Sequence, residues 1–128
     1  MRLLLDSHIA IWSAASESKL TAGEREALAV ASPVVSVVTT WEARFKWNSF
    51  YAPGERKGAI DPVSLLAFVQ AFGWQLPPLT ARHAATSLGK PMLHRDPFNE
   101  LLPVQAQVEG LKLLTRDRLL AGHPLAYA

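Results

Sequence analysis

The stretch Arg-Leu-Leu-Leu-Asp-Ser-His at residues 2–8 decides the fold, because it joins an apolar run to an acidic residue and a helical pattern. Residues 2–5 form the apolar run, which is typical of a buried strand, and Asp6 ends it. Residues 7–15 then predict a helix. A buried strand that leads directly into a helix is the repeating unit of parallel α/β sheets.

The same unit recurs along the rest of the chain. Residues 34–38 are apolar and β-branched, which makes them the best strand candidate, and prolines and glycines among charges at 50–62 predict a surface loop. Further strand candidates are residues 74–79, 112–115 and 125–127. Helices are expected at residues 20–31, 40–48, 62–72, 80–88 and 97–109. Strands that alternate with helices imply a parallel sheet covered on both faces.

The composition is that of an ordinary soluble globule. With 128 residues, 49% hydrophobic and 19% charged, the chain is expected to form a single domain over residues 1–128. The formal net charge of +2 fits a nucleic-acid ligand, but many proteins with other partners are as basic. The absence of cysteine excludes disulfides, thiolate zinc sites and a cysteine nucleophile, and is compatible with a cytoplasmic location. The apolar N-terminus is too short for a signal peptide, and no stretch approaches the ~20 apolar residues of a membrane span.

Three acidic residues, Asp6, Glu42 and Asp117, each follow a short strand pattern. In an open parallel sheet the ends of the strands converge on one crevice, so residues distant in sequence become neighbours there. Gathered carboxylates repel one another unless a cation lies among them, and Mg²⁺ takes oxygen ligands. The pattern therefore points to a metal-dependent nuclease site.

Each of these acids also has an ordinary structural explanation. Asp6 and Asp117 could cap a helix or a turn, and Glu42 lies three residues after Thr39, which is the spacing of a capping box. Taken singly, each acid is ambiguous. Three acids at the same topological place in successive strand–helix units are much harder to attribute to capping alone.

Basic residues accompany the acids. Lys46 follows Glu42 on the same expected helix, while Arg95 and Arg116 flank the other acidic positions. Basic groups around an acidic centre suit a phosphodiester substrate, so these three are candidate substrate-binding residues. Solvated surface charge is the alternative explanation.

Four segments resemble PIN-domain proteins, specifically the VapC-type toxins of bacterial toxin–antitoxin pairs. They are Leu-Leu-Leu-Asp-Ser-His at 3–8, Val-Ser-Val-Val-Thr-Thr-Trp-Glu at 35–42, His-Arg-Asp-Pro-Phe-Asn-Glu-Leu-Leu at 94–102 and Glu-Gly-Leu-Lys-Leu-Leu-Thr-Arg-Asp at 109–117. They span nearly the whole chain in the family's order. The resemblance implies a three-layer α/β/α sandwich around a parallel, Rossmann-like sheet, here of four to five strands. It also implies RNA cleavage with Mg²⁺ or Mn²⁺, a cognate antitoxin that covers the groove, and a homodimer.

The same resemblance implies a catalytic, metal-binding set in which the fourth acid is replaced. Asp6, Glu42 and Asp117 match three of the family's acids, and Asn99 stands where the fourth is expected. The amide oxygen of Asn99 can still face a cation, but without a negative charge the metal affinity should fall. Natural divergence and an engineered Asp→Asn change both explain Asn99. Ser7 stands where Thr is more usual, keeps the hydroxyl, and is a further candidate for substrate contact.

Pro103 departs from the pattern on the same expected helix, at a position that is normally an aliphatic helix former. Inside a helix it would remove the hydrogen bond to the Asn99 carbonyl, at a cost of about 3 kcal/mol in an unsupported helix. Either the helix bends here or its expected boundary is wrong.

Two functions follow from these patterns. The first is a Mg²⁺- or Mn²⁺-dependent endoribonuclease toxin that Asn99 weakens. The second is a degenerate PIN module that binds RNA or an antitoxin without turnover.

Overall fold

The protein is built on a three-stranded parallel sheet with strand order β2-β1-β5. The computed structural model describes residues 1–92 and 97–127, and the side chains of residues 97–99 are outside this description. The strands are β1 (Arg2–Leu5), β2 (Ser32–Val34) and β5 (Lys112–Leu114). In the central strand, Leu4 lies opposite Val34 on one side and Leu113 on the other. Because β1 pairs in parallel with both β2 and β5, all three strands end on the same side of the sheet.

Alternation along β1 creates two hydrophobic cores. Leu3 and Leu5 belong to one cluster and Leu4 to the other, and all three are fully buried. Successive side chains of a strand point to opposite faces, so a run of leucines is required in a strand that is covered on both sides. The neighbouring strands repeat the pattern, because Leu113 joins the core of Leu4 and Leu114 joins the core of Leu3.

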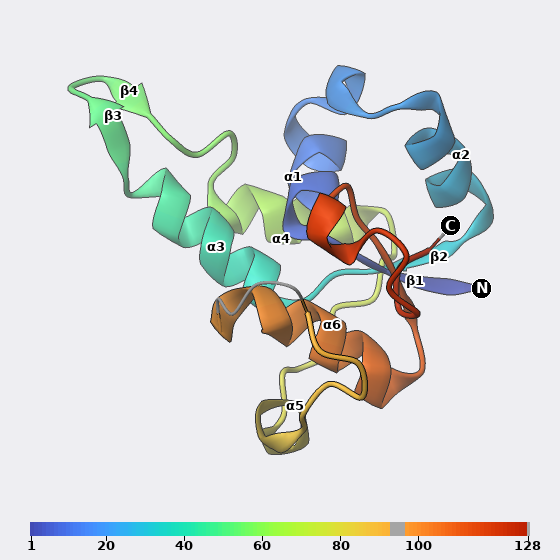
Figure 1. Ribbon diagram of the computed structural model, residues 1–128. Coiled ribbons are helices and arrows are strands. Elements are labelled where there is room, and N and C mark those ends of the chain that lie inside the picture. Colours follow the sequence, from blue (N-terminus) through green and yellow to red (C-terminus); the bar gives the residue numbers. More distant parts are fainter. Residues whose placement is uncertain (93–96, 128) are drawn as a thin grey trace.

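Helices cover both faces of the sheet, which confirms the expected three layers (Figure 1). The Leu3–Leu5 core is completed by α1 (Ser7–Ala15), α2 (Ala22–Val30) and α4 (Pro62–Ala71). The Leu4 core is completed by α6 (Pro97–Glu109), against which the short α5 (Ala81–Ala85) packs. Helix α3 (Val37–Trp47) contributes to both cores. No helix within the described residues is long and apolar enough to cross a membrane.

The expected number of strands in the sheet, four to five, is wrong for the described residues. The candidate at residues 74–79 makes a single bridge, between Gln75 and Val34, and the candidate at 125–127 makes a single bridge between Ala126 and Leu113. Prolines at 77 and 78 provide no amide hydrogens, so the first candidate cannot extend its ladder. The sheet is therefore flanked at each edge by a segment that pairs at one residue.

Two other expectations are corrected. The strand expected at 34–38 ends at Val34, because the Ser36 hydroxyl accepts from the Val38 amide (3.0 Å) and caps α3, so the helix expected from residue 40 begins at Val37. The surface loop expected at 50–62 contains an antiparallel hairpin of β3 (Phe50–Ala52) and β4 (Glu55–Arg56). The guanidinium of Arg56 lies over the rings of Trp47 and Phe50, which holds this hairpin to the end of α3.

Two helices are shorter than expected. The helix expected at 20–31 is α2, with Thr21 as the cap that the sequence predicts, and a 3₁₀ turn, η1 (Glu17–Lys19), precedes it. The helix expected at 80–88 is α5, which ends at Ala85. Its cap is a box between Thr80 and His83, whose ring is buried and also contacts the Glu109 carboxylate at 2.8 Å.

Pro103 lies inside α6, so the expected boundaries of this helix are confirmed. Its ring is fully buried, and residue 103 has no amide hydrogen to donate to the carbonyl of Asn99. The helix continues to Glu109, where Gly110 with a φ of 68° ends it. Tertiary packing therefore holds a helix that tolerates one missing backbone hydrogen bond.

Two glutamines of α6 provide a test of how this helix is held. Gln105 is fully buried, and within the described chain its side-chain nitrogen and oxygen have no hydrogen-bond partner. Gln107 instead accepts from the Gly89 amide (2.8 Å) and donates to the Ser87 carbonyl (3.0 Å). Gln105→Leu should raise the free energy of unfolding by about 1–3 kcal/mol, because it removes a desolvated amide without a partner.

The matched change Gln107→Leu should lower the free energy of unfolding by about 1 kcal/mol, because it breaks two hydrogen bonds to the 87–89 loop. Urea denaturation of both variants measures the two effects. Destabilisation by Gln105→Leu of the same size as that by Gln107→Leu would show that Gln105 is satisfied in solution.

Candidate active site

Asp6 lies at the junction of β1 and α1 and has two roles there. It caps α1 by accepting from the Ser7 amide at Oδ1 (2.7 Å), and its Oδ2 accepts from the Thr115 hydroxyl (2.7 Å). Its own amide donates to the Leu114 carbonyl at 2.9 Å, which ties it to the end of β5. The carboxylate is therefore fixed by the first amide of α1 and by the residue that follows β5.

Asp117 is held by the same threonine. Its amide donates to the Thr115 hydroxyl oxygen (3.0 Å), and its Oδ1 accepts from the Leu119 amide (2.9 Å) at the start of the 3₁₀ turn η2 (Arg118–Leu120). The Thr115 hydroxyl thus donates to one acidic residue and accepts from the backbone of the other. A single side chain sets the relative position of Asp6 and Asp117.

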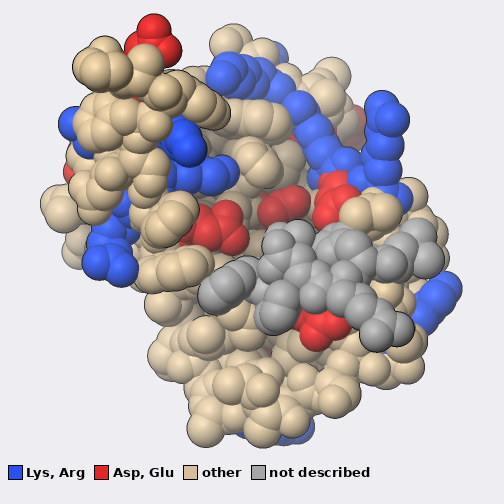
Figure 2. Space-filling view, turned by 60° about the vertical axis from the view of Figure 1, so that its left-hand side comes forward, with Lys and Arg blue, Asp and Glu red and all other residues tan. Residues whose placement is uncertain are grey.

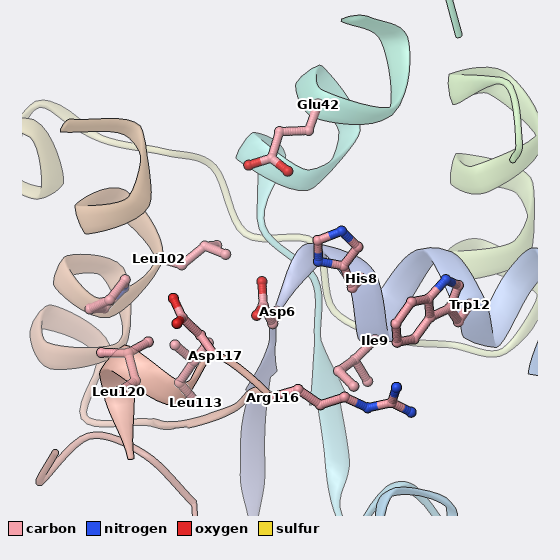
Figure 3. A pocket seen from close by; sticks show the side chains of 11 residues that line it. Asp6, His8, Ile9, Trp12, Glu42, Leu102, Leu113, Arg116, Asp117 and Leu120 are labelled. Atoms are coloured by element: carbon pink, nitrogen blue, oxygen red, sulfur yellow. The ribbon is translucent and has the colours of Figure 1, made fainter. Parts of the chain in front are cut away.

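Glu42 approaches from α3, and its carboxylate points into the same pocket (Figure 3). It does not cap α3, because Ser36 is the capping residue and Glu42 lies in the middle of the helix. The capping explanation therefore holds for Asp6 and Asp117 but not for Glu42. The pocket has a volume of about 360 Å³ and is lined by Asp6, His8, Ile9, Trp12, Glu42, Leu102, Pro103, Leu113, Arg116, Asp117 and Leu120.

The acidic side chains of the pocket provide part of a ligand set for a hard divalent cation. Within residues 1–92 and 97–127, no three acidic, histidine or cysteine side chains are close enough together to hold a metal. The pocket nevertheless brings three carboxylates to one crevice, and the Thr115 hydroxyl orients one of them, as groups behind a metal ligand commonly do. Mg²⁺ usually retains several waters and needs only one or two protein carboxylates. Asp6 and Asp117 are the residues that would hold it.

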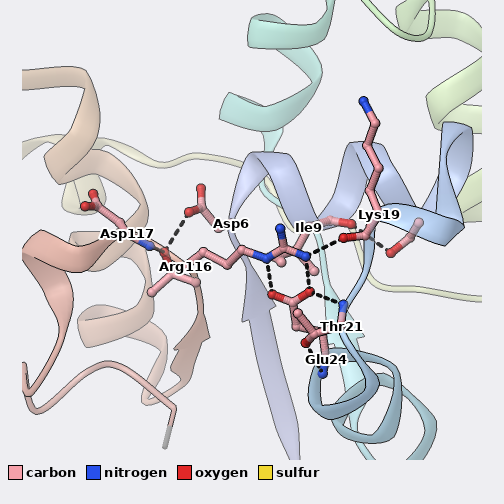
Figure 4. Close-up of polar contacts among 9 residues, drawn as sticks. Asp6, Ile9, Lys19, Thr21, Glu24, Arg116 and Asp117 are labelled. Carbon is pink, nitrogen blue, oxygen red and sulfur yellow. Dashed lines mark hydrogen bonds and ion pairs between the residues drawn. The ribbon is translucent and has the colours of Figure 1, made fainter.

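Arg116 lines the pocket, but its charge is directed away from the acids. The guanidinium donates to both carboxylate oxygens of Glu24 and to the Lys19 carbonyl, and it lies 4.5 Å from the centre of the Trp12 ring (Figure 4). This hydrogen-bonded pair lowers the pKa of Glu24 despite the opposing effect of burial, and it raises the pKa of Arg116. The candidate substrate contact is therefore part of a structural ion pair.

The remaining sequence candidates differ in their placement. Ser7 is buried, and its hydroxyl lies 3.0 Å from that of Thr39, so it joins α1 to α3 and does not face the pocket. Lys46 lies in the last turn of α3 and lines a neighbouring pocket. Arg95 and the side chain of Asn99 lie outside the described residues, although the backbone of Asn99 belongs to the first turn of α6.

Sequence reasoning missed three residues of the site: Thr115, His8 and Trp12. Thr115 stands two residues before Asp117, at a strand end where a hydroxyl can reach a neighbouring acid. His8 and Trp12 are one turn apart on α1, with ring centres 5.4 Å apart, and both line the acidic pocket. Their spacing on one helix face was the available signal.

The surface around the site has a definite charge pattern. Figure 2 shows acidic side chains gathered across the middle of one face, with lysine and arginine side chains above and to both sides. Such a distribution attracts a cation to the centre and polyanions to the margins.

The Glu24–Arg116 pair gives a pH-dependent contribution to stability. Because the pKa of Glu24 is lower in the folded protein, its contribution is fully present above the ordinary value of 4.5 and is lost as pH falls through the folded value. Glu24→Gln should therefore lower the free energy of unfolding by about 1–3 kcal/mol at neutral pH, and the difference should shrink as the pH falls toward about 3. Urea denaturation over this pH range measures it.

The exposed Glu26 on the same helix provides the control. Glu26→Gln should change stability little at any pH. A Glu24→Gln effect that stays constant from neutral to acid pH would contradict the assignment of the ion pair.

Comparison with known proteins supports the fold. No family model matches the chain, and no curated protein matches its sequence. Among solved structures, a toxin–antitoxin complex from Klebsiella pneumoniae matches with a TM-score of 0.63 and 17% identity, over 98% of this chain and 96% of that chain. VapBC2 from Rickettsia felis, bound to a promoter DNA fragment, matches with a TM-score of 0.61 and 12% identity, with the same coverage. At these identities the likeness establishes a shared α/β fold.

Proposed function

We propose that this protein is a metal-dependent endoribonuclease of the PIN type that acts as the toxin of a toxin–antitoxin pair. The observation that carries the proposal is the convergence of three carboxylates on one pocket: Asp6 directly after β1, Asp117 shortly after β5, and Glu42 from the middle of α3. The likeness to chains from two toxin–antitoxin complexes supports the biological role. The proposal includes an antitoxin that covers this pocket and a homodimer, as in the family that the sequence resembles.

The chemistry assigns different tasks to the three acids. Bound Mg²⁺ or Mn²⁺ would polarise the scissile phosphate and lower the pKa of an attacking water. Asp6 and Asp117, held by Thr115, would keep the cation at the strand ends. Glu42 lies on another element and faces the pocket, so its carboxylate would accept a hydrogen bond from the attacking water.

Asn99 favours a second candidate, a PIN module that binds RNA or the antitoxin without turnover. A neutral amide at the fourth acidic position lowers the negative charge available to a cation.

A cleavage assay on mixed RNA with Mg²⁺ and Mn²⁺ separates the two candidates. Asn99→Asp should raise metal-dependent cleavage by about ten- to a hundredfold, because it restores a negative charge at the metal site. Adding Asp6→Ala to this variant should abolish the gain in cleavage. In a Mn²⁺ titration, the Asn99→Asp protein should likewise bind the metal more tightly than either the parent or the double variant.

Three results would change the interpretation. If neither protein cleaves RNA while both bind it, the binding module is correct. Cleavage that a chelator leaves unaffected would exclude the metal mechanism. A gain with Asn99→Asp that survives Asp6→Ala would place the reaction elsewhere.

Thr115 offers a test of how the acids are positioned. Thr115→Val removes the hydroxyl shared by Asp6 and Asp117 and keeps the shape of the side chain, so Mn²⁺ affinity of the Asn99→Asp protein should fall about ten- to a hundredfold. Thr115→Ser keeps the hydroxyl and should stay within about threefold of the parent. Equal affinities for the Val and Ser variants would show that the hydroxyl does not position the acids.

A further inference from the structure

A second pocket lies directly beside the acidic one. It has a volume of about 250 Å³, and His8 and Trp12 line both pockets, so these two rings form a shared wall. The far side of the second pocket is formed by Lys46 on α3, Tyr51 on the hairpin and Lys57 after β4. A bound polymer that crosses the His8–Trp12 wall would therefore enter both pockets.

The charge of this second pocket is opposite to that of the first. Lys19, Lys46 and Lys57 come from three separate elements and line the same cavity. None of the described residues that line it is acidic. The ion pairs found in the described part of the chain involve neither Lys19 nor Lys46. Three ammonium groups around one cavity favour a bound anion.

Aromatic rings line the same pocket as these lysines. The rings of His8 and Trp12 lie 5.4 Å apart, and the ammonium of Lys57 lies 5.2 Å from the centre of the Tyr51 ring. Tyr51 is 77% exposed, so a face of its ring is available to a ligand. Lysines combined with exposed rings are typical of surfaces that bind single-stranded nucleic acid, because bases stack on rings while phosphates meet the charges.

The pocket depends on a close backbone contact. A Cβ added at Gly58 would lie 2.7 Å from the backbone N and Cα of Trp47. The Lys57 amide also donates to the Ser49 carbonyl at 2.8 Å. The loop after β4 is therefore pressed against the end of α3, which brings Lys57 to the same cavity as Lys46.

We propose that this lysine pocket binds a backbone phosphate of single-stranded RNA, next to the nucleotide whose phosphate occupies the acidic pocket. This inference rests on the proposed function and adds residues that hold the substrate strand. Phosphates recur at every nucleotide, so a strand that crosses the His8–Trp12 wall places one in each pocket. An acidic protein segment would satisfy the lysines, but it would leave the exposed rings without partners.

The test measures binding of a short, mixed-sequence, single-stranded RNA by fluorescence anisotropy, with a chelator present to prevent cleavage. The Lys46→Gln, Lys57→Gln double variant should bind about tenfold more weakly at low salt. The magnitude of the slope of log affinity against log salt should fall by about 0.7, because the two lysines hold one phosphate and each lost phosphate contact removes about 0.7. Lys112→Gln removes one charge at the opposite end of the sheet and should leave affinity and slope unchanged.

A second variant separates RNA from an acidic protein. Tyr51→Ala should weaken RNA binding about fivefold or more, since a stacking surface is lost, and should leave binding of a poly-glutamate peptide unchanged. Because Tyr51 is exposed, its replacement should not alter thermal unfolding.

The outcomes distinguish this inference from the proposed function. RNA affinity that the lysine changes leave intact would overturn the phosphate pocket, while metal-dependent cleavage by the Asn99→Asp protein would still support the nuclease. Poly-glutamate that binds as tightly as RNA, with no effect of Tyr51→Ala on either, would assign the pocket to an acidic protein segment. Lysine-dependent RNA binding without any cleavage would support the pocket and contradict the nuclease.

Discussion

Complete burial of the three leucines of β1 is the constraint on which the rest of the structure depends. Leu3, Leu4 and Leu5 are fully buried, so β1 needs apolar neighbours on both of its faces. It also pairs with a strand on each side, and both conditions are met only at the centre of the sheet. This placement puts Asp6 beside the end of β5, within reach of the Thr115 hydroxyl. Hydrophobic packing thus positions the polar site, since Asp6 and Asp117 follow strands whose register the core determines.

The separation of charge around the site has a comparable origin. Arg116 is adjacent to Asp117 in sequence, and a free guanidinium there would lie close to the acids. The Glu24 carboxylate and the Trp12 ring instead hold the Arg116 guanidinium away from the acids. The acidic pocket and the lysine pocket therefore stay electrostatically distinct, although α1 contributes the His8–Trp12 wall to both.

Much of this arrangement was accessible from the sequence, and the exceptions have physical reasons. The strand-end rule predicted that Asp6, Glu42 and Asp117 would share a crevice, and all three line one pocket, although Glu42 reaches it from the middle of α3 and not from a strand end. The strand predicted at residues 34–38 was wrong in its second half. β-branched residues favour strands, but the Ser36 cap and the burial of Val38 place that half in α3. Pairing of Glu24 with Arg116 joins residues 92 positions apart, and no local pattern reports such a contact.

The shared His8–Trp12 wall also gives the two pockets a fixed order along a bound strand. If the strand is cut in the acidic pocket, only one of the two fragments still reaches the lysines. That fragment would dissociate slowly and the other quickly, so turnover would be limited by one end of the product rather than by the chemical step. If the protein cleaves RNA as proposed, the polarity with which the strand crosses α1 would determine which new terminus the protein retains.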